Sequence, residues 1–399
     1  MTLRFLTAGE SHGPELMVIV EGMPARVPIF LEEIDRDLAR RQLGYGRGAR
    51  STKIERDHAE VVAGVVAGRT TGAPIGVRIV NRDFANQPAE PEPLTTPRPG
   101  HADLMGRVKY GLEDFRLVRE RASARETAAR CVAGAIAKHL LRPFGARVAS
   151  FVVSVGPVEA SIGTGPDWPG VLGEADLEAL ARRAEDDPLR CPDPFASERM
   201  RAEVDGARAA GETLGGVFCV VACGVPPGLG SYVMWDRKLD GRLAQALCSI
   251  HAIKGVQIGR AFRLAQLRGT EAQDPIVLDR GEVVRTSNHA GGLEAGVTNG
   301  QPIVILGAMK PLSSVRAPMS SVDFATGTPA DPPYVRSDVC AVPAAAVVGE
   351  AMVAWILASA VVERFGADRL DIMLQAYRSV ADAALPGAIG PVVEAEEIP

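Results

Sequence analysis

The chain has 399 residues, of which 46% are hydrophobic, so it can bury a large core. Its formal net charge of -5 argues against general nucleic-acid binding, because a duplex binder needs a dominant positive face. The longest apolar run near the C-terminus, residues 351–362, is shorter than the roughly 18 to 20 residues that span a bilayer. No basic and apolar export signal opens the chain, so we expect a cytoplasmic protein without a membrane span.

Strands are expected where short runs of Val, Ile or Phe are bounded by Gly or Pro, over residues 16–20, 75–80, 148–155, 217–223 and 303–309. Helices are expected over residues 31–42, 123–142, 174–186, 239–249 and 343–365. The two kinds of element are mixed without a regular repeat, which favours an α+β layered fold over a doubly wound parallel sheet. No low-complexity linker divides the chain, so we expect one domain over residues 1–384 and a flexible acidic tail over 385–399.

The segment from Ser123 to Glu126 has the spacing of a capping box, and it predicts a helix that begins at Ser123. The free N–H groups of that helix start, next to Arg121 and Arg125, could bind a phosphate. A routine cap on a surface helix is the simpler interpretation of the spacing.

Basic residues are concentrated in two stretches of this acidic chain. Residues 40–56 contain Arg40, Arg41, Arg47, Arg50, Lys53 and Arg56, against one acid, Glu55. Residues 98–130 contain Arg98, Arg107, Lys109, Arg116, Arg119, Arg121, Arg125 and Arg130. Local cationic pockets on an acidic protein favour a small polyanionic ligand.

Two histidines lie in loops that Gly and Pro define. His12 follows Gly9-Glu-Ser11, and His101 follows Arg98-Pro-Gly. Such loops let backbone approach a ligand closely, and an imidazole can transfer a proton near neutral pH. His58 and His139 are most simply structural, whereas His251 and His289 could line a site. The turn-rich stretches at 288–292, 296–300 and 310–314 could hold a phosphate or a planar ring, or could be ordinary hairpin turns.

Other cofactor and metal signals are weak. No Gly-x-Gly-x-x-Gly follows a strand, which disfavours a dinucleotide-binding domain. The six cysteines are scattered, and Cys219 and Cys223 have no second pair or nearby His to complete a metal set, so we expect buried thiols and no metal.

The chain closely resembles chorismate synthases over roughly residues 3–378. Long motifs in fixed order carry this resemblance: Gly9-Glu-Ser-His-Gly-Pro, Arg40-Arg-Gln-Leu-Gly-Tyr-Gly-Arg-Gly, Arg98-Pro-Gly-His-Ala-Asp, Arg121-Ala-Ser-Ala-Arg-Glu-Thr-Ala, Arg190-Cys-Pro-Asp-Pro, Ser287-Asn-His-Ala-Gly-Gly, Thr298-Asn-Gly-Gln-Pro-Ile-Val and Arg336-Ser-Asp-Val-Cys. The resemblance implies a lyase that converts 5-enolpyruvylshikimate 3-phosphate to chorismate and phosphate, the last step of the shikimate pathway. It also implies helices sandwiched between antiparallel sheets, a homotetramer, and reduced FMN that is not consumed overall.

The resemblance also implies roles for individual residues. His101 would protonate or stabilise the departing phosphate, His12 would protonate reduced flavin near N1 and the C2 carbonyl, and Asp338 would assist proton transfer around N5. Ser11, Arg41 and Arg47 would contact the substrate, and the two arginines also match NADP-binding positions of the family. The positions that match FMN contacts are Arg121, Ala122, Ser123, His251, Ala252, Ala295, Lys310, Pro311, Leu312, Ser313, Ser314 and Arg336.

Four positions depart from the family pattern. His251 and His289 add imidazoles where amides are common, Ala295 replaces a more usual Gly, and Glu212 stands where Asp is common. These changes concern the details of cofactor contact more than the reaction.

Two other functions compete with the lyase. The first is an NADPH-dependent flavin reductase, but the chain has no added NADPH domain, which favours an external flavin reductase as the source of reduced FMN. The second is a non-catalytic RNA or phosphoprotein binder. Aromatic residues make up 5% of the chain and do not interleave with the arginines, so no stacking platform for bases is expected.

Overall fold

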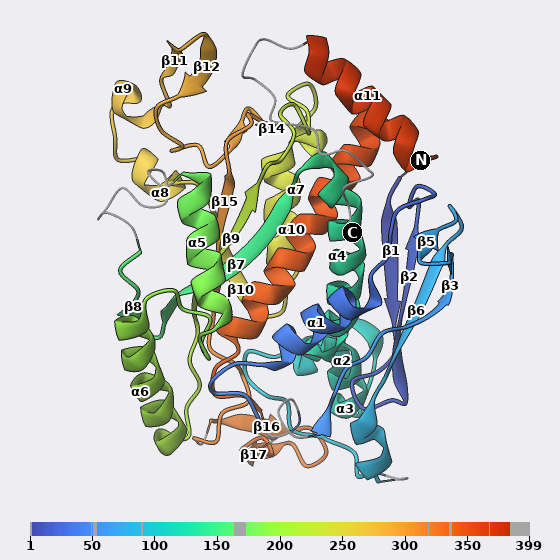
Figure 1. Ribbon diagram of the computed structural model, residues 1–399. Coiled ribbons are helices and arrows are strands. Elements are labelled where there is room, and N and C mark those ends of the chain that lie inside the picture. The colour runs from blue at the N-terminus through green and yellow to red at the C-terminus, as the bar shows by residue number, and fades with distance from the viewer. Residues whose placement is uncertain are drawn as a thin grey trace.

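The computed structural model describes residues 2–48, 50, 54–88, 91–162, 173–317, 319–334, 337–366 and 368–383. Two antiparallel sheets face each other across a layer of helices (Figure 1). The first sheet has the strand order β1 (Arg4–Ala8), β2 (Glu15–Glu21), β6 (Ile75–Val80), β3 (Glu60–Ala63). The second has the order β10 (Ile253–Ile258), β15 (Ile303–Met309), β9 (Gly216–Cys223), β7 (Arg147–Val155), β8 (Val158–Glu159). The α+β prediction is therefore confirmed.

Alternating side chains fix the first sheet against the helices. Leu16, Val18 and Val20 of β2 are at most 1% exposed, whereas Met17 and Ile19 between them point outward and are more than 40% exposed. Successive side chains of a strand point to opposite faces, so one apolar row faces the core and the other lies on the outer surface. The outer face of this sheet is thus partly apolar.

Four helices lie between the sheets: α1 (Leu31–Gln42), α4 (Thr127–Leu141), α7 (Leu239–Cys248) and α10 (Val342–Phe365). In Figure 1, α10 runs through the centre of the molecule, with α4 and α1 between it and the first sheet. On its other side α10 packs against β7 and β9. Among the described residues, α10 is the helix whose length and apolar composition would allow it to cross a membrane. However, 94% of its most apolar stretch is buried inside the fold. It is therefore a core helix.

Small residues let α10 approach its neighbours closely. A Cβ atom added to Gly134 of α4 would lie 2.3 Å from the Cβ of Ala351 in α10. On the opposite side of α10, a Cβ atom on Gly349 would lie 2.6 Å from the ring of Phe218 in β9. Glycine at these two positions is what allows the helix backbones and the sheet to reach this separation.

The remaining elements surround this sandwich. Helices α5 (Glu174–Glu185) and α6 (Pro194–Ala210) pack on the second sheet from outside, and α11 (Leu370–Ala383) packs on the C-terminal part of α10. Helices α2 (Asp103–Tyr110) and α3 (Phe115–Ala122) lie at one end of the sandwich together with the hairpin β16–β17 (Figure 1). The other short elements are β4 (Val65–Val66), β5 (Arg69–Thr70), α8 (Ala261–Leu264), α9 (Gly269–Ala272), β11 (Ile276–Asp279), β12 (Glu282–Arg285), β13 (Leu293–Glu294), β14 (Val297–Thr298), β16 (Ser321–Asp323) and β17 (Thr328–Ala330).

The expected strands and helices are all present, with ends shifted by a few residues. The largest difference is at Ser123, where no α-helix begins: α3 ends there, a 3-10 turn follows over Ala124–Glu126, and α4 starts at Thr127. The Ser123 hydroxyl accepts a hydrogen bond from the N–H of Arg125 at 3.3 Å. The Glu126 carboxylate accepts from the Thr7 hydroxyl and from Arg130, so the predicted capping box does not form. The helix start predicted at Ser123 was therefore wrong, whereas Ser123 itself lines the cavity described below.

Candidate active site

A cavity of about 750 Å³ opens at the end of the sandwich where the N-terminal loop, the loop before α2 and the start of α10 meet. This volume is near the upper end of the roughly 300–1,000 Å³ usual for ligand sites, so it can hold more than one small molecule. Among the described residues that line it, seven carry a cationic side chain: Arg41, Arg47, Arg50, Arg98, Arg119, Arg125 and Lys310. Three lining carboxylates, Glu55, Asp83 and Asp338, leave the cavity with an excess of positive charge that favours anionic ligands.

The N-terminal loop places His12 in the cavity wall. Gly9 has a φ of +102° and lies so close to the Glu15 carbonyl that a Cβ atom would be 2.3 Å from that oxygen. Glu120 of α3 then holds His12 twice, through the backbone N–H at 2.7 Å and through Nδ1 at 2.8 Å. Burial raises the pKa of the Glu120 carboxyl, but these hydrogen bonds outweigh burial and hold the pKa below its usual range. The Nδ1 atom therefore faces a carboxylate that is charged at neutral pH.

His101 is held in a similar way on the opposite loop. The chain turns at Gly100, which has a φ of +73°, and the N–H of His101 donates to the Arg98 carbonyl. Asp103, at the start of α2, lies 2.5 Å from Nδ1 of His101 through Oδ1. Nη2 of Arg98 lies 3.1 Å from each ring nitrogen. Both predicted histidines thus line one cavity, and each faces a carboxylate through Nδ1.

Asp338 lies where the segment before α10 meets the loop after α1. Its Oδ2 atom accepts from Arg47, and its Oδ1 atom accepts from the backbone N–H of Gly48 at 2.6 Å. The backbone N–H of Val339 donates to the Gly46 carbonyl at 2.8 Å, which joins the two segments beside the ion pair. The cavity wall therefore contains a carboxylate and a guanidinium whose positions depend on each other.

Arg41 is almost completely buried beside the same cavity. Its guanidinium donates to the Thr127 hydroxyl and to the Ala124 carbonyl, both at 2.9 Å. Burial lowers the pKa of Arg41 to about 10, and the nearby Asp57 carboxylate partly offsets that effect. Asp57 also accepts from Arg125 at 2.6 Å, so one buried carboxylate supports two of the cavity arginines.

The cavity wall fits a planar aromatic cofactor such as a flavin. Near the start of α10, the wall consists of small apolar side chains, and across the cavity it continues through Ala122, Ile250 and Ala252. The residues of α10 and the segment before it are Ala341, Ala344, Ala345 and Val348. Small side chains leave a smooth apolar surface beside a cationic one, which is the combination that a ring system with a phosphate tail requires.

His251 and Lys310 complete this side of the cavity. Burial lowers the pKa of His251 to about 4, so its imidazole is neutral at neutral pH. The backbone N–H of Lys310 donates to the Ala252 carbonyl at 2.9 Å, and its ammonium donates to the Gly100 carbonyl at 3.0 Å. The ammonium thus reaches toward the turn that carries His101.

Most of the residues predicted as a site are brought together in this cavity. The lining includes Ser11, His12, Arg41, Arg47, His101, Ala122, Ser123, His251, Ala252, Lys310, Leu312, Ser313, Ser314 and Asp338. Arg121 instead donates to the carbonyl and hydroxyl oxygens of Thr7, and Pro311 is not in the lining. Ala295 occupies the turn between β13 and β14, outside the lining, with a φ of +51°. Arg336 lies outside the described residues.

The sequence analysis did not assign site roles to several lining residues or to the acids behind them. Arg50, Arg98, Arg119 and Arg125 belong to the two basic stretches, which was the available signal. Glu120 and Asp57 gave no signal, because their partners are far away in the sequence. Asp103 stood within the His101 motif, but its contacts could not be inferred from that spacing.

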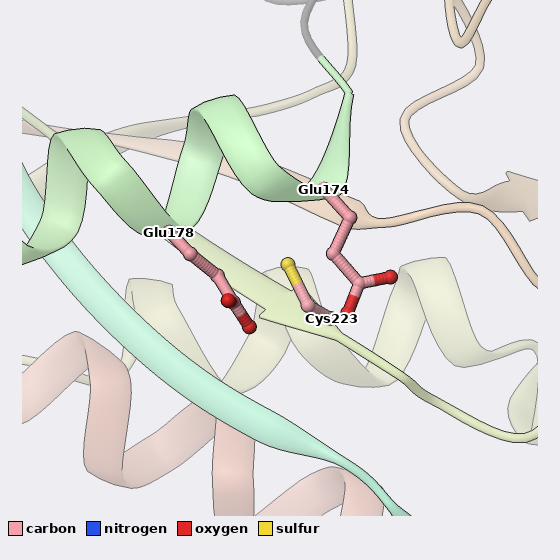
Figure 2. Close-up of side chains that lie close together, drawn as sticks. All are labelled: Glu174, Glu178 and Cys223. Carbon is pink, nitrogen blue, oxygen red and sulfur yellow. The ribbon is translucent and has the colours of Figure 1, made fainter. Parts of the chain in front are cut away.

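One cluster with metal-binding residue types lies elsewhere, between α5 and the end of β9. Figure 2 shows Glu174 and Glu178 of α5 beside Cys223. Arg147 donates to Glu178 at 2.6 Å and to Glu174 at 2.8 Å, so both carboxylates already have a cationic partner. Burial raises the pKa of Cys223 to about 12, which keeps the thiol protonated. Glu174 and Glu178 therefore form ion pairs with Arg147 beside a buried, protonated thiol.

Fold and cavity together define an enzyme that binds anionic small molecules beside a wall of small apolar side chains. The family model for chorismate synthase matches residues 3–362. The chain is 53% identical over 386 residues to the chorismate synthase of Rubrobacter xylanophilus, covering 94% of this chain and 96% of that protein. It is 51% identical over 388 residues to the enzyme of Desulforudis audaxviator, with the same coverage. A crystal structure of chorismate synthase superimposes with a TM-score of 0.78 at 41% identity, covering 96% of this chain and 98% of that one.

The chain therefore belongs to the chorismate synthase family. Its activity is that of a carbon–oxygen lyase, which eliminates phosphate from 5-enolpyruvylshikimate 3-phosphate to give chorismate in aromatic amino acid biosynthesis. The family requires reduced FMN.

Proposed function

We propose that the cavity is the site of this elimination, with His101 and His12 as its proton donors. The observation that carries the proposal is that both imidazoles line one cation-rich cavity and each faces a carboxylate through Nδ1. A carboxylate at Nδ1 favours the Nδ1–H tautomer and leaves Nε2 facing the cavity as the atom that takes up and releases a proton.

The reaction needs a proton donor and cations for the leaving group. The carbon–oxygen bond to phosphate breaks and its electron pair leaves with the phosphate. A ring hydrogen leaves as a proton, its bonding electrons form a new ring double bond, and the existing double bond moves by one position toward the carbon that loses phosphate. Asp338, which lines the cavity, is the group that we assign to carrying this proton away. His101 gives a proton to the departing phosphate. Arg98 and Arg119, which adjoin His101 through Asp103, stabilise the negative charge that develops there.

The substrate also carries carboxylates, which need cations of their own. We assign Arg41, Arg47 and Ser11 to substrate binding. Because Arg41 is held by Thr127, Ala124 and Asp57, it presents a fixed guanidinium and loses little freedom when an anion binds.

When bound, reduced FMN supplies transient electron density for the loss of phosphate. The residues that would hold it are Ala122, Ser123, His251, Ala252, Lys310, Leu312, Ser313 and Ser314, which line the cavity. Arg121, Pro311, Ala295 and Arg336 stay predicted contacts from the family resemblance. His12 holds a proton at Nε2, and Asp338 is the carboxylate that we assign to proton transfer.

The wider setting is also part of the proposal. We assign the protein to the cytoplasm, as one domain over residues 1–384, with an external flavin reductase that provides reduced FMN and with NADPH as the ultimate reductant. A homotetramer is supported by the apolar outer face of the first sheet, where Leu6, Met17 and Ile19 are exposed. Sedimentation equilibrium tests the tetramer, and a monomer at micromolar concentration would contradict it.

The test of the proposed function is an anaerobic single-turnover reaction with 5-enolpyruvylshikimate 3-phosphate and chemically reduced FMN. We expect chorismate and phosphate in equal amounts and FMN that is still reduced at the end. A second reaction with NADPH and oxidised FMN, without substrate, tests the competing reductase. Rapid NADPH oxidation without chorismate formation in the first reaction would replace the proposal with the reductase.

A further inference from the structure

Asp103 is a fully buried carboxylate that lies behind the cavity and is not part of its lining. Its Oδ1 atom faces Nδ1 of His101 at 2.5 Å. Its Oδ2 atom accepts from Nε of Arg98 at 3.1 Å and from Nε and Nη2 of Arg119 at 3.2 and 3.1 Å. All three partner side chains line the cavity. One carboxylate therefore connects three separate groups of the cavity wall.

The position of Asp103 at the start of α2 has a simpler explanation, because acids are common in the first turn of a helix, where they complement its dipole. That role does not require contacts with three side chains. The backbone N–H of Arg98 also donates to Oδ2 at 3.0 Å, so Asp103 closes the loop that carries His101 back onto itself. These contacts fix the His101 loop and the side chains of the cavity wall rather than the helix end.

The charge on Asp103 is permanent under working conditions. Burial alone would raise the pKa of its carboxyl, but hydrogen bonds from His101 and Arg98 outweigh burial and hold the pKa far below its usual range. At neutral pH the Asp103 carboxylate therefore has no proton to donate. It can act on the reaction through the groups that it holds.

We propose that Asp103 is a positioning residue that fixes His101 as the Nδ1–H tautomer and aims Arg98 and Arg119 at the departing phosphate. This inference deepens the proposed function and rests on the role assigned there to His101. With its Nδ1–H directed at Asp103, the ring uses Nε2 for proton transfer. When Nε2 also carries a proton, Arg98 has no acceptor on the ring, so its Nη2 keeps the 3.4 Å contact with Oδ1 of Asp103 and can direct its other N–H to an anion.

The test replaces Asp103 by Asn, which keeps the shape of the side chain and removes the charge. An amide can donate to Nδ1 as well as accept from it, so the tautomer is no longer enforced. We expect kcat to fall about 10- to 100-fold, in line with the loss of an outer carboxylate that orients an imidazole. We also expect KM for the substrate to rise, because both guanidinium groups lose their anchor. Nitrogen NMR of the His101 ring in the neutral form reads out the tautomer directly: Nδ1–H in the unsubstituted protein and a mixture in D103N.

Asp114→Asn is the matched control. Asp114 caps α3, accepts from Leu94 N–H, Arg116 N–H and the Arg116 side chain, and is not part of the cavity lining. We expect D114N to keep kcat and KM within about twofold and to leave the His101 tautomer unchanged, because Asn can still cap the helix and no cavity contact is removed. A kcat loss in D114N equal to that in D103N would show a general structural effect and overturn the inference.

A double-mutant cycle with His101→Ala separates the positioning role of Asp103 from the proton-donor role of His101. If Asp103 acts partly through His101, that part of its effect is lost in the H101A background, so D103N should lower kcat by a smaller factor there than in the unsubstituted protein. The kcat loss that remains, together with the effect on KM, reports the two guanidinium groups. Full multiplication of the two kcat losses would overturn the role of Asp103 and leave His101 in place. A wild-type kcat in H101A would instead remove the proton-donor role of His101.

If D103N does not fold, the proposal can still be tested by measuring the His101 tautomer in the unsubstituted protein. A neutral His101 ring that carries its proton on Nε2 would contradict the proposal. Asp103→Glu is the second variant. It keeps the charge, so we expect it to retain the Nδ1–H tautomer while its longer side chain displaces the ring and lowers kcat. Loss of that tautomer in a folded D103E protein would count against the proposal as well.

Discussion

Arg47 and Asp338 form an ion pair that joins the loop after α1 to the segment before α10, at the wall of the candidate active-site cavity. The second oxygen of Asp338 binds the Gly48 N–H, so both carboxylate oxygens are used. The substrate-binding role that we assign to Arg47 and the proton-transfer role of Asp338 are therefore coupled. A change in one residue alters the charge and the position of the other.

The first prediction is that Asp338→Asn lowers kcat by about 10²-fold, the effect expected when a proton-transfer group is lost. KM should change as well, because Arg47 loses its charged partner and turns toward bound anions. Steady-state kinetics under anaerobic conditions, together with FMN titration, measure both effects. Asp205→Asn is the control, since Asp205 pairs with Arg208 and Tyr45 at the surface. If D338N lost FMN affinity and kept kcat, the carboxylate would have a positional role alone.

The second prediction concerns the two imidazoles. His12→Ala and His101→Ala should each lower kcat by about 10²-fold or more and largely keep FMN affinity, because both remove a proton donor and little contact area. His58→Ala is the matched control, since His58 is exposed and pairs with Asp35 outside the cavity. Wild-type kcat in both cavity variants would remove the assignment of proton donors.

The sequence singled out most residues that line the candidate site, but it did not single out the residues that support them. His12 and His101 could be singled out because Gly and Pro next to them define loops, which is a local property. Glu120 is 108 positions from His12, and no local pattern indicates that α3 returns to that loop. The capping-box prediction at Ser123 failed for a related reason: Glu126 has a tertiary partner, Thr7, which replaces the local contact. Contacts that depend on tertiary packing can be identified only when the fold is known.

The third prediction is that His139 contributes to acid destabilisation. Burial lowers the pKa of His139 in the folded state to about 4 from an ordinary value of 6.5. Between these values the unfolded chain binds the proton and the folded protein does not, so the free energy of unfolding falls as the pH drops from about 6.5 to 4. The contribution is at most about 3 kcal/mol.

His139→Gln removes this titration. We expect the free energy of unfolding of H139Q, measured by urea titration at several pH values, to depend less steeply on pH between 4 and 6.5. The slope is the test, because the variant also loses the 3.1 Å contact between Nε2 and Glu33 and so changes the absolute stability at every pH. Equal slopes in the two proteins would show that His139 is protonated in the folded state.

The fourth prediction uses the close contact between α4 and α10. Gly134→Ala places a methyl group 2.3 Å from the Cβ and 2.4 Å from the Cα of Ala351, and backbone atoms cannot move aside as a flexible side chain can. Overpacking of this kind costs about 1–3 kcal/mol, which exceeds the gain of up to about 1 kcal/mol from the higher helix propensity of Ala. The midpoint of urea unfolding should therefore fall.

Gly206→Ala supplies the matched control for Gly134. Gly206 lies within α6, and apart from its chain neighbours and the backbone of its own helix no heavy atom lies within 4 Å of the position where its Cβ would be. The same substitution there has the helix-propensity gain without the clash, so it should stabilise the protein by about 0.5–1 kcal/mol. If the free energy of unfolding falls for G134A and rises for G206A, the glycine at position 134 sets the separation of α4 and α10. Stabilisation by both would mean that α4 and α10 can move apart at little cost in free energy.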